Sequence, residues 1–160
     1  MKPEVSREQV PVELLLPFLK EMLEAGKSVN LTVTGNSMMP LLRNGYDSVV
    51  LVRPEKIKQF DIVLYMNQEN KAILHRIIRC KPSGYLIVGD NQFQVDGPVK
   101  PEQIVAVVTE FNRNGKNISC SKWWVKLYAF IWGYGRPLRN FIFPLVRLGG
   151  KIIKRLERME

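Results

Sequence analysis

A chain of 160 residues with 46% hydrophobic residues has the length of one domain and enough apolar side chains for a core, which excludes a disordered protein. Cys80, Cys120 and His75 are its only cysteines and histidine, so too few ligands are present for a structural zinc site. The net charge of +9 comes entirely from residues 111–160, because residues 1–110 carry 13 basic and 13 acidic side chains. A disulfide between the two cysteines is an open alternative, but two lone thiols are more typical of a protein in a reducing compartment.

The first predicted element is a helix over residues 11–25. Apolar residues recur there at helical spacing, namely Leu14, Leu15, Phe18, Leu19, Met22 and Leu23. Gly26 follows as a helix stop. The N-terminal sequence is charged and amphipathic, unlike a secretory signal, and no uncharged apolar run approaches the roughly 18 residues of a spanning helix. We therefore expect no signal peptide and no transmembrane helix, and a protein that is cytoplasmic or peripheral at a membrane.

From Val29 to Thr109 the pattern changes to short, β-branched-rich segments separated by turn signals. The segments are NLTVT, SVVLV, DIVLYM, AILHRIIR, GYLIVGD and QIVAVVTEF, and the Asn-Gly step of FNRNGKN then predicts a hairpin turn. Six short strands in about 80 residues indicate a compact antiparallel or mixed β-domain rather than βαβ units. We therefore divide the chain into an N-terminal helix (1–28), a β-rich domain (29–118) and a C-terminal tail (119–160).

The tail is helical in pattern, aromatic and basic, and Pro137 and Pro144 break it into short pieces. Nine of the 15 aromatic residues lie in residues 111–160. Trp and Tyr favour the lipid–water interface and Lys and Arg favour anionic head groups, so residues 122–158 are expected to contact an anionic membrane surface as amphipathic helices. The alternative is that the tryptophan face packs on the β-domain or on a partner subunit. Nucleic acid is disfavoured, because no DNA- or RNA-binding motif accompanies the basic residues.

The candidate catalytic residues are one serine, one histidine and two aspartates. Ser37 lies in TGNSMMP, a glycine-led turn that a proline ends. A serine hydroxyl needs a base to remove its proton, and His75 in AILHRII is the only histidine. Asp90 and Asp96, both in VGDNQFQVDG, are the acidic groups that could orient that histidine. Taken singly, each residue also has a purely structural interpretation in a loop, a strand or a turn.

The order and spacing of these segments favour the catalytic interpretation. TGNSMMPLL, DIVLY, LHRII and YLIVGDN followed by VDG resemble, in that order, the signal peptidase and self-cleaving repressor superfamily of serine endopeptidases, over roughly residues 30–109. The resemblance implies a compact β-domain with Ser37 as the nucleophile. Bacterial signal peptidases and the repressors place a lysine base where this chain has His75. The archaeal and endoplasmic-reticulum type places a histidine there, so the chain resembles the Ser-His branch.

The resemblance also assigns the remaining site residues. In the Ser-His branch an aspartate after the Gly-Asp-Asn element assists the histidine, and Asp96 matches it. Asp90 matches the aspartate inside the element, which more often supports the site structurally. The Ser37 amide is the expected oxyanion donor, Gly35 lets the turn approach the substrate, and Met38 is expected to line the site. No metal or cofactor is implied.

Three features depart from the family pattern. NGYDSVVL inserts Tyr46 where the family usually has Gly-Asp, Phe60 stands where glycine usually precedes DIV, and the N-terminal membrane anchor of signal peptidases has no counterpart. We expect a mainly β (α+β) serine endopeptidase with an N-terminal helix and C-terminal amphipathic helices, which cleaves a peptide or protein substrate by Ser-His-Asp acyl transfer.

Two alternatives remain. One is a non-catalytic module that binds peptide on the same fold. The other is a self-cleaving regulator of the repressor type, which ranks lower because residues 1–28 are too short for a helix-turn-helix domain and no Ala-Gly cleavage linker precedes Ser37.

Overall fold

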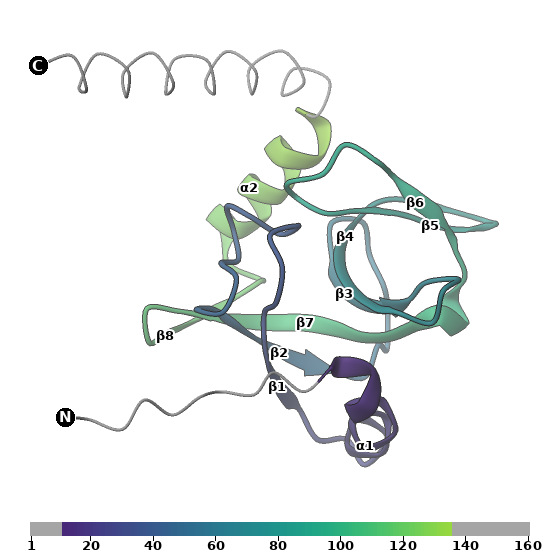
Figure 1. The fold of residues 1–160 in the computed structure, drawn as a ribbon. Helices are drawn as coiled ribbons and strands as arrows, with labels where there is room; N and C mark the ends of the chain where they lie inside the picture. The colour runs from purple at the N-terminus through teal and green to yellow at the C-terminus, as the bar shows by residue number, and fades with distance from the viewer. Residues whose placement is uncertain (1–10, 136–160) are drawn as a thin grey trace, which may run out of the picture.

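The structure, a computed structural model, describes residues 11–135 of the chain. Within this range two α-helices flank a set of strands (Figure 1). The elements in chain order are α1 (Val12–Glu24), β1 (Val29–Thr32), β2 (Ser48–Val52), β3 (Ile62–Met66), β4 (Ala72–Lys81), β5 (Gly84–Val88), β6 (Asp96–Val99), the 3-10 helix η1 (Pro101–Gln103), β7 (Ile104–Arg113), β8 (Lys116–Ser119) and α2 (Trp123–Tyr134). The predicted mainly β fold with a helix at each end is confirmed. The rest of the predicted tail lies outside the described residues.

Helix α1 ends where the sequence predicts, at a glycine in the left-handed region. Gly26 has a φ of 73°, which costs a glycine little because it has no Cβ. The amides of Gly26 and Lys27 donate to the carbonyl oxygens of Leu23 and Met22, the pattern of a Schellman motif. Leu19 and Leu23 anchor the helix in the core. After the glycine the chain turns into β1.

The strands form one antiparallel sheet in the order β1-β2-β7-β3-β4-β5-β6, with β8 paired to β7. The long strand β7 pairs with β2, β3 and β8, and in Figure 1 it runs between α1 on one side and α2 on the other. The predicted hairpin joins β7 to β8, and both Asn114 and Gly115 have a positive φ, as a type I′ turn requires. Strand β6, with the sequence DGPV, was not predicted because Gly and Pro are typical of turns.

Two clusters of buried side chains form the core. The larger lies between the two helices and the β1-β2-β7 part of the sheet, and it includes Met38, Phe111 and Val125. The smaller cluster includes Val63 and Tyr65 of β3. Burying each large apolar side chain of this kind stabilises the fold by roughly 1.5–3 kcal/mol.

Two further expectations from the sequence concern a disulfide and a membrane-spanning helix. Cys80 and Cys120 are both free, so they form no disulfide. No helix in residues 11–135 has the length and apolar character needed to cross a membrane.

Two departures from the family pattern have a clear structural explanation. Tyr46 is 83% exposed in the turn before β2, so its insertion disturbs no packing. Phe60 has a φ of 75°, a left-handed conformation in which a glycine avoids strain on the order of 1–2 kcal/mol. The Phe60 ring lies edge-on to the rings of Phe130 and Tyr134 in α2. A Cβ added to Gly133 would lie 2.6 Å from that ring, so Phe60 ties α2 closely to the β-domain.

Candidate active site

Ser37 is half-buried in the loop that joins β1 to β2. Gly35 begins the turn with a φ of 82°, and its amide donates to Oδ1 of Asn44 at 3.0 Å. Met38 is 1% exposed and belongs to the larger core cluster, so its side chain anchors the loop from beneath. The next residue, Met39, is half-buried. Gly35 and Ser37 therefore lie in one braced loop, whereas the side chain of Met38, which was predicted to line the site, is buried in the core.

His75 lies in the middle of β4, directly across from Val63 of β3, and is 3% exposed. Its Nδ1 lies 3.2 Å from Oδ2 of Asp96, the first residue of β6. The hydroxyl of Tyr65 donates to the same Asp96 oxygen at 2.6 Å. Tyr65 shares a face of β3 with Val63, because side chains two residues apart on a strand point the same way. Strand pairing thus produces a hydrogen-bonded series of Tyr65, Asp96 and His75.

The other ring nitrogen of His75, Nε2, lies near Ser37. Gly89, just after β5, lies between them: a Cβ added there would be 3.0 Å from Nε2 of His75 and 3.0 Å from Cβ of Ser37. Nε2 and the serine Cβ are therefore no farther apart than twice 3.0 Å. The Asn91 amide donates to the Ser37 carbonyl oxygen at 2.7 Å, which holds the serine loop against the segment after β5. Ser37 and Asp96 thus lie near the two different nitrogen atoms of one imidazole.

The electrostatics favour a neutral histidine in a defined tautomer. Burial lowers the pKa of His75, and the charge and hydrogen bond of Asp96 oppose that shift only in part. An ionised carboxylate can only accept hydrogen bonds, so Nδ1 carries the ring proton and donates a hydrogen bond to Asp96. Burial also raises the pKa of Tyr65, with Asp96 adding to the shift, so its hydroxyl remains a donor. Nε2 is then left with a free lone pair on the side of Ser37, as a general base requires.

Asp90 forms an ion pair with Arg76, the residue that follows His75. Nε and Nη2 of Arg76 donate to its two carboxylate oxygens at 2.8 and 2.7 Å, and both side chains are buried. Burial alone would lower the pKa of Arg76, but Asp90 reverses the shift and raises it. Arg76 follows His75 on β4, and Asp90 follows Gly89. The pair therefore clamps β4 to the turn that separates Ser37 from His75.

Helix α2 supports the same turn from outside. The Tyr128 hydroxyl donates to Oδ2 of Asp90 at 3.2 Å, and Nε1 of Trp132 donates to the Asp90 carbonyl oxygen at 2.7 Å. The Arg76 guanidinium lies over the Tyr128 ring, 5.6 Å from its centroid. The inner face of α2 thus supports both members of the buried ion pair.

Sequence reasoning did not identify Tyr65, Gly89, Tyr128 or Trp132 as part of the site. Tyr65 gave a weak signal, because it is the one hydroxyl-bearing residue in the otherwise aliphatic IVLYM strand. Its relation to Asp96 depends on strand register. The role of Gly89 depends on a close approach of three segments. Neither is visible in a linear sequence.

Comparison with known proteins agrees with this architecture. The family model described as Peptidase S24-like matches residues 3–109, a range that holds every predicted site residue. No curated protein sequence matches the chain. The family belongs to the superfamily of self-cleaving repressors and signal peptidases that the motifs predicted, so that prediction is confirmed at the level of the superfamily. The chain therefore belongs to the Peptidase S24-like family.

Proposed function

We propose that this protein is a serine endopeptidase of the Ser-His type, resembling signal peptidases, that cleaves a peptide or protein substrate by acyl transfer. The observation that carries the proposal is the arrangement around His75. Nδ1 contacts Asp96, which Tyr65 holds, while Nε2 faces the Ser37 loop across Gly89. A nucleophile, a base and a group that orients the base are the parts that acyl transfer by serine requires.

In this mechanism the Ser37 hydroxyl oxygen attacks the carbonyl carbon of the scissile peptide bond. His75 Nε2 takes the hydroxyl proton, and the Asp96 carboxylate stabilises the resulting imidazolium through Nδ1. His75 then gives the proton to the leaving amine as the carbon–nitrogen bond breaks, which leaves an acyl ester on Ser37. A water molecule, deprotonated by His75, hydrolyses that ester and restores the serine.

The negative charge that develops on the substrate carbonyl oxygen needs a donor, and the backbone amide of Ser37 is the proposed one. Gly35 supports this assignment. A Cβ added at that position would have no atom within 4 Å, so the side of the turn next to the serine is open. A substrate backbone can approach there without meeting a side chain.

Two other functions remain as alternatives. A non-catalytic peptide-binding module would not need a buried histidine whose neutral form is favoured beside a serine, and this favours catalysis. A self-cleaving regulator would use the same residues on a segment of its own chain. Its cleavage rate would be independent of protein concentration, whereas cleavage of other molecules would depend on it.

A serine-directed fluorophosphonate probe, followed by mass spectrometry, tests the proposal. We expect the probe to label Ser37 in the wild type and to leave Ser37→Ala unlabelled, and a peptide library to be cleaved only by the wild type. Ser83→Ala, at an exposed serine of the β4–β5 hairpin, is the matched control and should behave as the wild type. Equal cleavage by the wild type and a folded Ser37→Ala would refute the proposal.

A further inference from the structure

Helix α2 presents a second apolar face away from the β-domain. Val125 and Ala129 are buried on the inner face, together with the half-buried Tyr128 and Trp132 that contact Asp90 or Arg76. The outer face is a single stripe at helical spacing, with each side chain between 47% and 75% exposed: Trp123, Leu127, Phe130, Ile131 and Tyr134. A helix that is apolar all round is normally covered on every side, by protein or by lipid. Within the described residues the Phe60 ring touches one edge of this stripe, at Phe130 and Tyr134, and every member of the stripe still keeps about half or more of its surface exposed.

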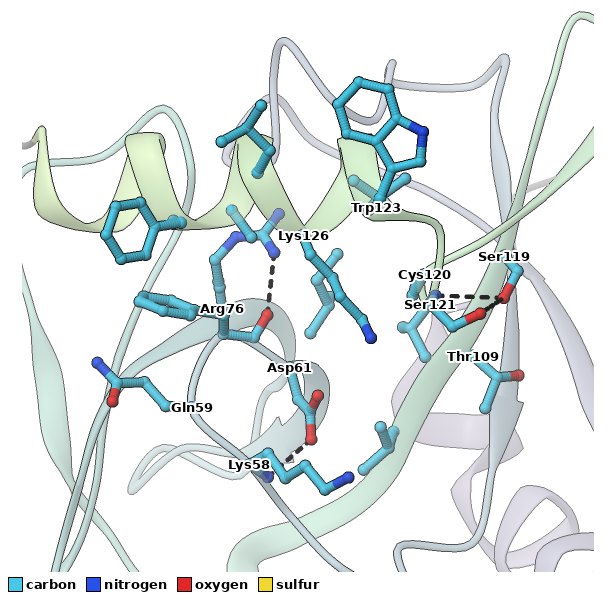
Figure 2. A pocket seen from close by; sticks show the side chains of 18 of the residues that line it. Lys58, Gln59, Asp61, Arg76, Thr109, Ser119, Cys120, Ser121, Trp123 and Lys126 are labelled. Atoms are coloured by element: carbon cyan, nitrogen blue, oxygen red, sulfur yellow. Dashed lines mark hydrogen bonds between the residues drawn. The ribbon is translucent and has the colours of Figure 1, made fainter.

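A groove with a volume of about 960 Å³ runs beside the stripe, between α2 and the sheet (Figure 2). Its walls are mainly apolar and include Leu127 and Phe130 of the stripe. Three exposed lysines line it, Lys56, Lys58 and Lys126, and Figure 2 shows the side chains of Lys58 and Lys126 extending into the same space. The exposed apolar stripe and a cluster of basic groups therefore lie together.

The other charged groups of the groove do not cancel this cluster. Arg76 is held by Asp90. Asp61 is the only carboxylate among the groove residues, and the Lys58 amide donates to it at 2.7 Å. The three lysines therefore outnumber the one carboxylate of the groove. The groove beside α2 thus keeps an excess of positive charge.

We propose that α2 docks the protein on an anionic lipid bilayer, with the aromatic stripe in the interface and the groove lysines on lipid phosphates. Charge complementarity favours lipid over an uncharged protein surface, because α2 contains no acidic residue and Lys122 precedes it. The sequence that follows has the same character, since residues 136–158 carry seven basic side chains against Glu157. Trp and Tyr on the stripe suit the head-group level of a bilayer.

The docking surface and the candidate active site share one element. The outer face of α2 would contact lipid while its inner face holds Asp90, next to the Gly89 turn between Ser37 and His75. Docking would therefore bring the Ser37 loop close to the bilayer surface. Peptides that lie at or near a membrane are the substrates that this arrangement would favour.

Intrinsic fluorescence of the full chain tests the proposal directly, because all three tryptophans, Trp123, Trp124 and Trp132, lie in α2. Vesicles of phosphatidylglycerol mixed with phosphatidylcholine should shift the emission to the blue and carry the protein down on sedimentation. Vesicles of phosphatidylcholine alone should do so far less. Raising the ionic strength from about 0.1 M to about 1 M shortens the Debye length from about 10 Å to about 3 Å and should reverse most of the binding. Neither readout depends on peptidase activity, so failure here and failure of the proposed function are distinguishable.

Paired variants separate the two parts of the surface. Lys58→Gln with Lys126→Gln should weaken binding to the anionic vesicles by about tenfold or more. Leu127→Ser with Ile131→Ser should weaken it to a similar extent. These side chains are exposed, so all four substitutions should leave the circular dichroism spectrum unchanged.

Two single substitutions on other parts of the surface serve as matched controls. Phe18→Ser and Lys20→Gln replace exposed residues of α1, on the far side of β7 from α2, and should bind as the wild type. Equal binding to both vesicle types, or equal loss in the α1 controls, would overturn the proposal. The proposal would also be overturned if the protein bound no vesicles and sedimentation equilibrium showed a concentration-dependent dimer. The stripe would then be the interface between the two copies.

Discussion

The Tyr65 hydroxyl and the His75 imidazole meet at one oxygen atom, Oδ2 of Asp96, at 2.6 and 3.2 Å. A carboxylate with two donors on one oxygen has little freedom to rotate, so Tyr65 fixes the direction from which Asp96 addresses the histidine. This makes Tyr65 a positioning residue for the proposed base, because it lies on the strand next to β4 and acts on His75 through Asp96.

Tyr65→Phe should keep the ring in the core and remove only the hydroxyl. A hydrogen bond to a charged group contributes about 1.5–3 kcal/mol, so we expect kcat/KM to fall by roughly tenfold or more while the protein stays folded. With its competing donor gone, Asp96 should interact more strongly with His75 and raise the histidine pKa. The acid limb of the kcat/KM profile should then move to higher pH. A loss of stability with no movement of that limb would assign Tyr65 to packing alone.

Asp96→Asn should move the same limb in the opposite direction. The charge and hydrogen bond of Asp96 raise the pKa of His75 against the larger lowering by burial, so their removal lowers it further. We expect kcat/KM to drop roughly a hundredfold or more, because an asparagine can also donate to Nδ1 and favour the wrong tautomer. A kcat/KM profile over pH 4 to 8, with peptide cleavage as the readout, measures both effects. An unchanged profile would mean that Asp96 does not assist His75.

The stability of the wild type should also depend on His75. Its folded pKa lies below the ordinary value of 6.5, so the unfolded chain binds a proton more readily. The contribution of His75 to the free energy of unfolding is therefore full above pH 6.5 and is lost as the pH falls through the lowered pKa. Urea denaturation at pH 7.5 and pH 5 should show the decrease, and His75→Gln should make it smaller. A His75→Gln protein with an unchanged pH dependence would contradict this account.

Some elements of the fold and of the candidate site are predictable from the sequence, and others are not. The end of α1 at Gly26 and the Asn114-Gly115 turn were predictable, because each is specified by residues adjacent in the chain. The family and the residues Ser37, His75 and Asp96 followed from short motifs in a fixed order. Their approach in space did not, because it depends on which strands pair.

The groups missed by the sequence are those whose role comes from distant neighbours. The register of β3 against β4 places Tyr65 near the site, and the close approach of the Ser37 loop makes Gly89 necessary. The bonds from Tyr128 and Trp132 to Asp90 cross about forty residues of sequence. The sequence shows α2 only as an aromatic helix, whereas the structure separates its inner and outer faces.

Asp90→Asn should act mainly on stability, because the charge of Asp90 is the smallest of the contributions that raise the pKa of His75. The substitution leaves the buried Arg76 guanidinium without its carboxylate partner, and removing one member of a buried ion pair typically costs about 3–5 kcal/mol. Glu69→Gln is the matched control, because Lys71 and Glu69 form an exposed pair whose loss should cost at most about 1 kcal/mol. Urea denaturation of both variants measures the difference. Similar costs for the two would mean that the Arg76 pair contributes little to holding the turn.

Gly89→Ala tests whether Ser37 and His75 act at the distance seen in the structure. The new methyl group would lie 2.7 Å from the Ser37 carbonyl oxygen and 3.0 Å from Nε2 of His75, so the serine loop or the imidazole must move. A displacement of about 1 Å between reacting groups can cost about a hundredfold in rate, whereas overpacking of this kind costs about 1–3 kcal/mol in stability. We therefore expect fluorophosphonate labelling of Ser37 to slow by roughly a hundredfold in a protein that still unfolds cooperatively. Labelling at the wild-type rate in that folded variant would mean that His75 does not activate Ser37 across this gap.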